Sequence, residues 1–200
     1  MIVVGLTGSI AMGKSQTASM FEELGIPVFD SDSAVHRLYA EGGEAIPEIG
    51  RLFPQAVSNG TVDRQILSKC VLGSAELLRQ LEQIVHPLVR KHQRQFIDRC
   101  AQGGHPIAVL DIPLLLESEH QPDVDRIVVV SVPADMQRER ALARPGMTEE
   151  KLDLILSRQM PDSQKRVLAD FVVDTSMGLD HARAQVGEIV ETLRKEAHRQ

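Results

Sequence analysis

Glycine, lysine and serine near the start of the chain are spaced as in a phosphate-binding loop. Residues 8–15 read Gly-Ser-Ile-Ala-Met-Gly-Lys-Ser and fit the pattern Gly-x-x-x-x-Gly-Lys-Ser. In that pattern, backbone N–H groups at a helix N-terminus surround a polyphosphate, Lys14 neutralises its charge, and the Ser15 hydroxyl binds Mg²⁺. An apolar run at 2–6 and an amphipathic stretch at 16–24 provide the flanking strand and helix. These flanks disfavour the alternative, a glycine-rich turn without a ligand.

Two aspartates follow the second apolar run, at residues 26–29. In an extended chain, Asp30 and Asp32 leave the backbone on the same face. We expect Asp32 to accept the proton of an acceptor hydroxyl, and Asp30 to orient either that base or the water shell of a metal. The alternative is a structural role, in which an aspartate caps a helix at Ser33.

A third carboxylate, Asp111, directly follows the apolar run 107–110. In phosphate-loop proteins, an aspartate at this place reaches metal-bound water. Because an apolar run ending in aspartate is common, a structural role at the strand end stays open.

Arg140 and Arg144 are one helical turn apart, and Gln137 precedes Arg140 by three residues. On one helix the two guanidinium groups face the same way, a spacing suited to binding a triphosphate. A solvated basic face is the alternative, here and at Lys165 and Arg166.

The pair His86-Pro87, followed by Arg90, separates two helical patterns. At a helix start these residues would bind an anionic substrate group. A structural histidine is the alternative, and no second His or Cys has zinc-ligand spacing.

The elements that must position these residues follow an α/β pattern. Helical patterns separate five apolar, β-branched runs, at 2–6, 26–29, 107–110, 127–132 and 171–173. This alternation predicts a parallel sheet flanked by helices, as in phosphate-loop NTPases, with the aspartates gathered at the carboxyl ends of the strands.

Two helical excursions interrupt this pattern. The predicted organisation is a nucleotide-binding core at 1–32, 105–136 and 167–200, a helical substrate-binding insertion at 33–104, and a helical lid at 137–166. Within the insertion the strand signal vanishes, and helices are expected near 33–40, 63–72, 75–85 and 88–102. The lid carries seven Lys/Arg against five Asp/Glu, although the chain as a whole has a net charge of −6.

Composition restricts the class of ligand. The acidic net charge, with 3% aromatic residues, argues against a nonspecific nucleic-acid binder, so the ligand should be small. Cys70 and Cys100 lack metal-ligand spacing and indicate buried thiols in a reducing compartment. With neither a signal peptide nor an apolar stretch long enough to span a membrane, we expect a cytoplasmic protein; no oligomeric state is indicated.

Several motifs together resemble the dephospho-coenzyme A kinase family over nearly the whole chain. They are Val4-Gly5-Leu6-Thr7-Gly8, Asp30-Ser31-Asp32, Asp63-Arg64 with Leu67, His86-Pro87-Leu88, Asp111-Ile112-Pro113-Leu114-Leu115-Leu116-Glu117, Gln137-x-x-Arg140-x-x-x-Arg144, Gln159 and Ala169-Asp170. The Asp-Ile-Pro-Leu-Leu and His-Pro-Leu segments are more specific than the phosphate loop, which many ATPases share.

The resemblance implies transfer of the γ-phosphate of ATP, with Mg²⁺, to the ribose 3′-hydroxyl of dephospho-CoA. It implies catalytic roles for Asp32, Lys14 and Arg140, with Asp32 as the base. The residues expected to bind ATP are Gly8, Ala11, Met12, Gly13, Lys14, Ser15, Gln16, Arg140 and Arg144. Those expected to bind dephospho-CoA are Asp32, Arg64, His86 and Leu114, and those expected to hold the metal are Ser15, Asp30 and, through water, Asp111.

The chain departs from the usual family loop, Gly-Gly-Ile-Gly-Ser-Gly-Lys, at Ser9, Ala11 and Met12. A positive φ at Ala11 would cost about 1 kcal/mol and could weaken ATP binding. Thr175 replaces an asparagine often found after the last core strand, which leaves an adenine contact there open.

Two other functions are compatible with the phosphate loop. A nucleoside monophosphate kinase shares the loop, sheet and lid, but the long insertion with His86-Pro87 disfavours it. A nucleotide-binding switch is the alternative from another class. The paired aspartates and the arginine-rich lid favour catalysis, and no Asn-Lys-x-Asp run for guanine recognition is present.

Overall fold

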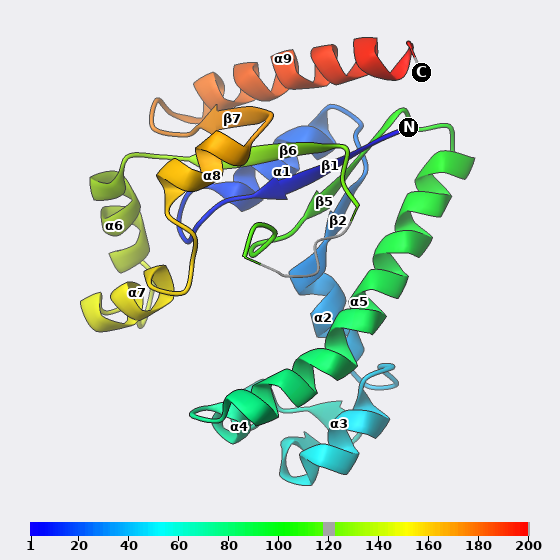
Figure 1. The fold of residues 1–200 in the computed structure, drawn as a ribbon, viewed down its shortest axis with the longest axis vertical. Coiled ribbons are helices and arrows are strands. Elements are labelled where there is room, and N and C mark those ends of the chain that lie inside the picture. Colours follow the sequence, from blue (N-terminus) through cyan, green and yellow to red (C-terminus); the bar gives the residue numbers. More distant parts are fainter. Residues whose placement is uncertain (118–122, 200) are drawn as a thin grey trace. The chain divides into compact units, whose positions relative to one another are not determined.

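The computed structural model describes residues 1–117 and 123–199. The chain divides into two compact units (Figure 1). The first unit combines residues 1–29 and 97–200, and the second comprises residues 30–96.

A five-stranded sheet organises the first unit, in the order β2-β5-β1-β6-β7. The strands are β1 (Ile2–Thr7), β2 (Val28–Asp30), β5 (Ile107–Asp111), β6 (Arg126–Ser131) and β7 (Phe171–Asp174). Strand β1 pairs in parallel with β5 and β6, and β6 pairs in parallel with β7. The register places Leu6 opposite Asp111, and Ser131 opposite Asp174, so that the carboxyl ends of these strands lie at one edge.

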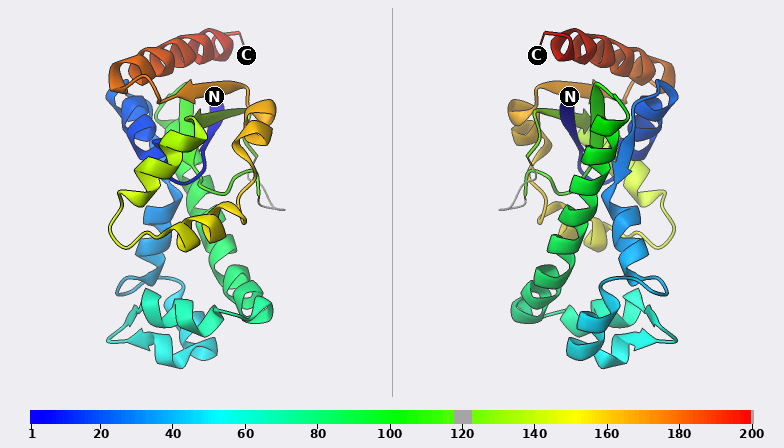
Figure 2. Two further views of the ribbon diagram at one scale, coloured as in Figure 1. Left: turned by 90° about the vertical axis from the view of Figure 1, so that its left-hand side faces the viewer. Right: turned by 90° about the vertical axis from the view of Figure 1, so that its right-hand side faces the viewer.

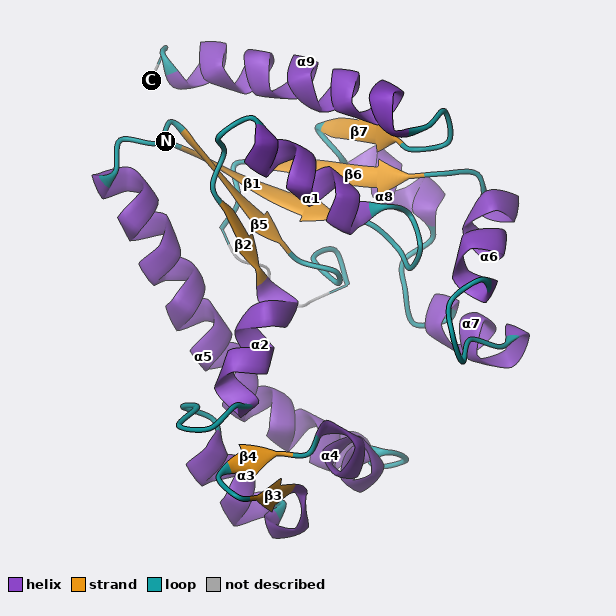
Figure 3. Cartoon of the chain, turned by 180° about the vertical axis from the view of Figure 1, so that it is seen from behind, coloured by secondary structure: helices purple, strands orange, loops and turns teal. Residues whose placement is uncertain are grey.

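Helices cover both faces of this sheet (Figure 3). Helices α1 (Lys14–Glu23) and α9 (Leu179–Ala197) pack against each other and share one apolar core with the strands, whereas α8 (Asp162–Leu168) contacts β6 on the other face. Helices α6 (Ala134–Leu142) and α7 (Glu149–Leu156) lie between β6 and α8 in the chain. The predicted α/β fold, a parallel sheet flanked by helices, is confirmed.

The second unit is mainly helical (Figure 2). Its elements are α2 (Ser31–Tyr39), α3 (Ile46–Leu52), a 3₁₀ turn η1 (Pro54–Ala56), strands β3 (Val57–Ser58) and β4 (Thr61–Val62), α4 (Arg64–Val71) and most of α5 (Ala75–Gln102). A separate apolar core holds them together and includes Leu38, Ile49, Phe53, Leu67 and Val85.

Two expectations for this region are wrong. Helix α5 continues through Pro87 over 28 residues, whereas the sequence predicted two helices divided at His86-Pro87. A proline removes one backbone hydrogen bond, and packing of the neighbouring Val85 and Leu88 in the core offsets this loss. The expected absence of strands also fails, because Asn59 and Gly60, with φ of 49° and 70°, form the turn of the short β3–β4 hairpin.

Candidate functional site

The phosphate loop joins β1 to α1 and leaves little room for side chains at two glycines. A Cβ atom at Gly8 would lie 2.8 Å from the carbonyl oxygen of Val130. At Gly13, where φ is 97°, it would lie 3.2 Å from the side chain of Thr175. Both positions therefore require glycine, as the motif predicts.

Ala11 has a φ of 63°, so it adopts the left-handed conformation. This is the positive φ that the sequence analysis considered for this position. Its methyl group is buried in an apolar cluster with Ala141 of α6 and Leu152 of α7. Burial of this methyl group partly offsets the backbone strain.

Three side chains from distant parts of the sequence contact the backbone of the loop. Gln137 Nε2 donates to Ile10 O at 2.9 Å, and Ile10 N–H donates to Gln159 Oε1 at 3.1 Å. The hydroxyl of Thr175 donates to Met12 O at 2.8 Å. The conformation of the loop thus depends on segments that follow β6 and β7.

Lys14, Ser15 and Gln16, which are expected to bind ATP, lie at the start of α1 and have different surroundings. Lys14 Nζ forms an ion pair with Oδ1 of Asp111, and both side chains are largely buried at the sheet edge. Ser15 and Gln16, in the first turn of α1, are exposed.

Arg140 points to the end of β7. Its guanidinium donates from Nη1 to Thr175 Oγ1 and from Nη2 to Thr175 O, both at 2.9 Å. The expectation that Arg144 shares its helix is wrong, since α6 ends at Leu142 and Arg144 lies exposed beyond it. The following Pro145 explains this end, because a residue before proline avoids the helical conformation.

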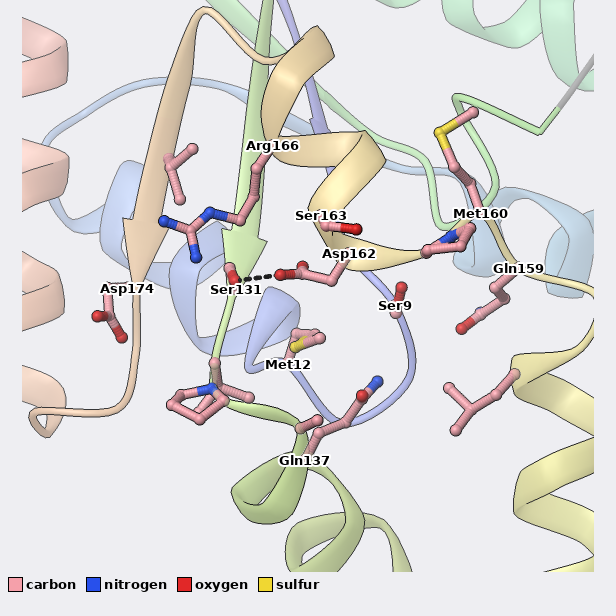
Figure 4. Close-up of a pocket in the computed structure, with 16 residues that line it drawn as sticks. Ser9, Met12, Ser131, Gln137, Gln159, Met160, Asp162, Ser163, Arg166 and Asp174 are labelled. Atoms are coloured by element: carbon pink, nitrogen blue, oxygen red, sulfur yellow. Dashed lines mark hydrogen bonds between the residues drawn. The ribbon is translucent and has the colours of Figure 1, made fainter.

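A cavity of about 710 Å³ lies beside the loop (Figure 4). Its lining residues include Ser9, Met12, Ser131, Gln137, Gln159, Asp162, Arg166 and Asp174. Ser131 Oγ donates to Asp162 Oδ2 at 2.7 Å. Hydrogen bonds from Ser176 lower the pKa of Asp174, so this carboxylate stays ionised at neutral pH.

Lys165 is a feature that sequence reasoning missed, because its basic segment suggested a solvated face. Its side chain is fully buried, and Nζ lies 2.7 Å from Oε1 of Glu117. The same carboxylate oxygen accepts from Met160 N–H at 2.9 Å. Removing either Lys165 or Glu117 would leave an uncompensated buried charge. Through its bond to Met160 N–H, Glu117 also holds the segment before α8.

The paired aspartates have different surroundings within the second unit. Asp30 caps α2, accepting from Ser33 N–H at 3.0 Å and from Ser33 Oγ at 2.7 Å. This is the capping role that the sequence left open. The expectation of an extended chain through Asp32 is wrong, because α2 begins at Ser31 and places Asp32, exposed, in its first turn.

The expected acceptor-binding residues of this unit lie on three different helices, α2, α4 and α5. Arg64 is the first residue of α4, and its Nη1 atom lies 2.7 Å from Nε2 of His36. Burial raises the pKa of the nearby Tyr39 hydroxyl, and the charge of Arg64 partly opposes that effect. His86 is exposed inside α5, so the predicted helix start at this position is wrong.

Leu114, expected at the acceptor pocket, belongs to the first unit. It lies in the turn after β5, with 48% of its surface exposed. The side chain is therefore accessible from solvent, and its role at the acceptor pocket stays a prediction.

The donor set at the loop suits Mg-ATP. The closely packed loop presents backbone N–H groups at the start of α1, next to Lys14, and Ser15 and Asp111 are oxygen ligands of the kind that Mg²⁺ prefers. Among the described residues, no cluster of three or more His, Cys, Asp or Glu could hold a metal.

Comparison with known proteins identifies the family. A model of the family described as dephospho-CoA kinase matches residues 2–181. The chain belongs to the dephospho-CoA kinase family. The dephospho-CoA kinase of Mesorhizobium japonicum is 56% identical over 194 residues, covering 97% of this chain and 98% of that protein. That of Rhodopseudomonas palustris is 53% identical over 191 residues, covering 96% and 95%.

Solved structures agree with this membership. TT1252 from Thermus thermophilus superposes with a TM-score of 0.82 at 31% identity, covering 96% of both chains. The dephospho-CoA kinase from Campylobacter jejuni has a TM-score of 0.65 at 20% identity over 96% of both chains, and supports the fold. The predicted dephospho-CoA kinase family and phosphate-loop kinase fold are therefore confirmed, and with them a phosphotransferase.

Proposed function

We propose that this chain transfers the γ-phosphate of ATP to the ribose 3′-hydroxyl of dephospho-CoA, giving CoA and ADP. The observation that carries the proposal is the match of one family model over residues 2–181, which include both the phosphate loop and the helical unit. A phosphate loop alone would support any of many nucleotide-binding functions.

The donor side of the reaction uses the loop and Lys14. Backbone N–H groups of the loop bind the phosphates, apart from those of Ile10 and Met12, which donate to Gln159 and Ser9. Lys14 neutralises charge on the outer phosphates. To do so, its ammonium group breaks the ion pair with Asp111. Bound Mg-ATP would supply the phosphoryl group to be transferred.

We assign the metal to Ser15 and, through water, to Asp111. Both lie in the first unit, at the start of α1 and the end of β5. Asp30 has a supporting role in this proposal. By capping α2, it fixes the helix turn that carries Asp32.

Phosphoryl transfer requires alignment and charge stabilisation more than covalent chemistry. Asp32 accepts the proton of the 3′-hydroxyl, a role assigned through the motif that it shares with the family. Arg140 and Arg144 stabilise the charge on the transferred group. The assignment of Arg140 is supported by its position beside the loop, on Thr175.

The acceptor is assigned to the helical unit and to Leu114. Arg64 and His86 offer exposed cationic or hydrogen-bonding groups to the anionic dephospho-CoA. Residues 33–104 are then the substrate-binding domain, and residues 137–166 the lid that carries the two arginines.

We infer a cytoplasmic protein whose partners are small molecules. No helix of the described ranges has the length and apolar character needed to cross a membrane. The net charge of −6 does not favour nucleic acid as a partner.

The experiment uses purified protein with Mg-ATP and either dephospho-CoA or a panel of nucleoside monophosphates. Released ADP and the mass of the product are measured. We expect CoA to form only when dephospho-CoA is present. Turnover with a monophosphate alone would assign the chain to the rival kinases, and nucleotide binding without any acceptor-dependent turnover would support a switch.

A further inference from the structure

The backbone N–H and C=O groups of Ile10, in the phosphate loop, both form hydrogen bonds with glutamine side chains. Ile10 N–H donates to Gln159 Oε1, and Ile10 C=O accepts from Gln137 Nε2, at 3.1 and 2.9 Å. Gln137 is on α6, with 7% of its surface exposed, and Gln159 follows α7. The two contacts join residues 127 and 149 positions apart in the sequence.

The next residue of the loop is the strained one. The carbonyl that Gln137 binds belongs to the peptide group leading into Ala11, whose φ is 63°. The side chains of the loop also pack on α6 and α7. Ile10 packs against the apolar cluster formed by Ala11, Ala141 of α6 and Leu152 of α7. Hydrogen bonds and apolar packing from one segment thus hold a backbone conformation that alanine rarely adopts.

The two amides act in complementary ways. Gln137 donates to the C=O of Ile10 and Gln159 accepts from its N–H, so each amide satisfies a different backbone group. Both side chains line the cavity beside the loop (Figure 4). An unbraced loop would sample other orientations of the peptide groups around Ile10 and Ala11, and these orientations would no longer suit a bound phosphate.

We propose that Gln137 and Gln159 are positioning residues that fix the phosphate loop at Ile10 and Ala11 for the binding of nucleotide phosphates. This inference deepens the proposed function, on which it rests for the identity of the nucleotide. The segment assigned as a lid therefore braces the phosphate loop at Ile10, in addition to carrying Arg140.

The test uses Gln137→Met and Gln159→Met, which keep the length of the side chain and remove the amide. Calorimetry gives the Kd for Mg-ADP, and initial rates give KM for ATP and for dephospho-CoA. We expect the Kd and the KM for ATP to rise about three- to tenfold, as for the loss of one hydrogen bond, with KM for dephospho-CoA unchanged. The matched control is Gln164→Met, the same change at an exposed glutamine of α8, which should alter none of these values.

The double variant Gln137→Met/Gln159→Met tests whether the amides act on one element. Because both hold Ile10, the loss in the double variant should be smaller than the product of the two single losses. Independent losses that multiply fully would contradict a shared brace.

Melting temperatures separate positioning from folding. If either methionine variant fails to fold, Gln137→Asn and Gln159→Asn replace it, since they keep the amide but shorten its reach, and the same loss is expected. Normal Mg-ADP affinity in folded variants would overturn the proposal. Should the wild-type protein bind Mg-ADP yet leave dephospho-CoA unphosphorylated, the proposed function fails while the Kd values still decide the role of the brace.

Discussion

The phosphate loop and the helical unit use opposite means to present functional groups. The loop is held by contacts from distant segments, with Ala11 and Met12 buried and hydrogen bonds at Ile10 and Met12. In the second unit, Asp32 and His86 are exposed on regular helices. The first region fixes backbone groups in space, and the second displays side chains.

This difference indicates a division of labour between the two regions. Rigid backbone N–H groups suit phosphate, which every nucleotide shares, so in the proposed function they bind ATP without selecting the acceptor. Exposed side chains supported by a separate apolar core can change without disturbing the loop. Variants near the loop should therefore affect ATP, and variants of the helical unit the acceptor.

The largest effect is expected at Asp32, the proposed base. Asp32→Asn should lower kcat about 100-fold or more, because a neutral amide cannot accept the proton of the 3′-hydroxyl. KM for ATP should stay within about twofold, as ground-state binding of the donor does not use this carboxylate. Initial rates at varied ATP and dephospho-CoA measure both values.

The matched control for Asp32 is Asp180→Asn, which changes another exposed aspartate in the first turn of a helix. It should leave kcat unchanged. A normal kcat in Asp32→Asn would show that the acceptor loses its proton without this carboxylate, and would remove the helical unit from the chemical step.

Much of the first unit could be predicted from the sequence because its signals are local. Continuous apolar runs identified all five strands of the sheet, and the phosphate-loop pattern identified the turn between β1 and α1.

The failures arise where tertiary contacts override local preference. Pro87 predicted a helix boundary, yet core packing on both sides keeps α5 continuous. Lys165 resembles any surface lysine in the sequence, and only the distant Glu117 explains its burial. The amides of Gln137 and Gln159 gave no local signal for the loop, because their partner precedes them by more than 120 residues.

An intermediate effect is expected at Thr175, which touches both the loop and an arginine. Thr175→Val removes the hydroxyl that donates to Met12 O and accepts from Arg140, while keeping the shape beside Gly13. We expect kcat/KM for ATP to fall about tenfold, equivalent to about 1.4 kcal/mol. Steady-state rates at saturating dephospho-CoA measure this value.

Thr175→Ser is the matched control, because it keeps the hydroxyl and removes the methyl group. It should retain most of the activity of the wild-type protein. Normal activity in Thr175→Val, together with a loss in Thr175→Ser, would assign the role of Thr175 to packing against Gly13 instead of hydrogen bonding.

The smallest effect is expected at Arg64, the exposed cation that begins α4. Arg64→Ala should raise KM for dephospho-CoA about threefold, since an exposed charge pair contributes little free energy, and should leave KM for ATP unchanged. Arg51→Ala is the control, because Arg51 is an exposed arginine of the same unit that pairs with the neighbouring Glu48 across one helical turn. If Arg64→Ala instead raised KM for ATP, the helical unit would take part in donor binding, and the division between buried backbone for the donor and exposed side chains for the acceptor would be wrong.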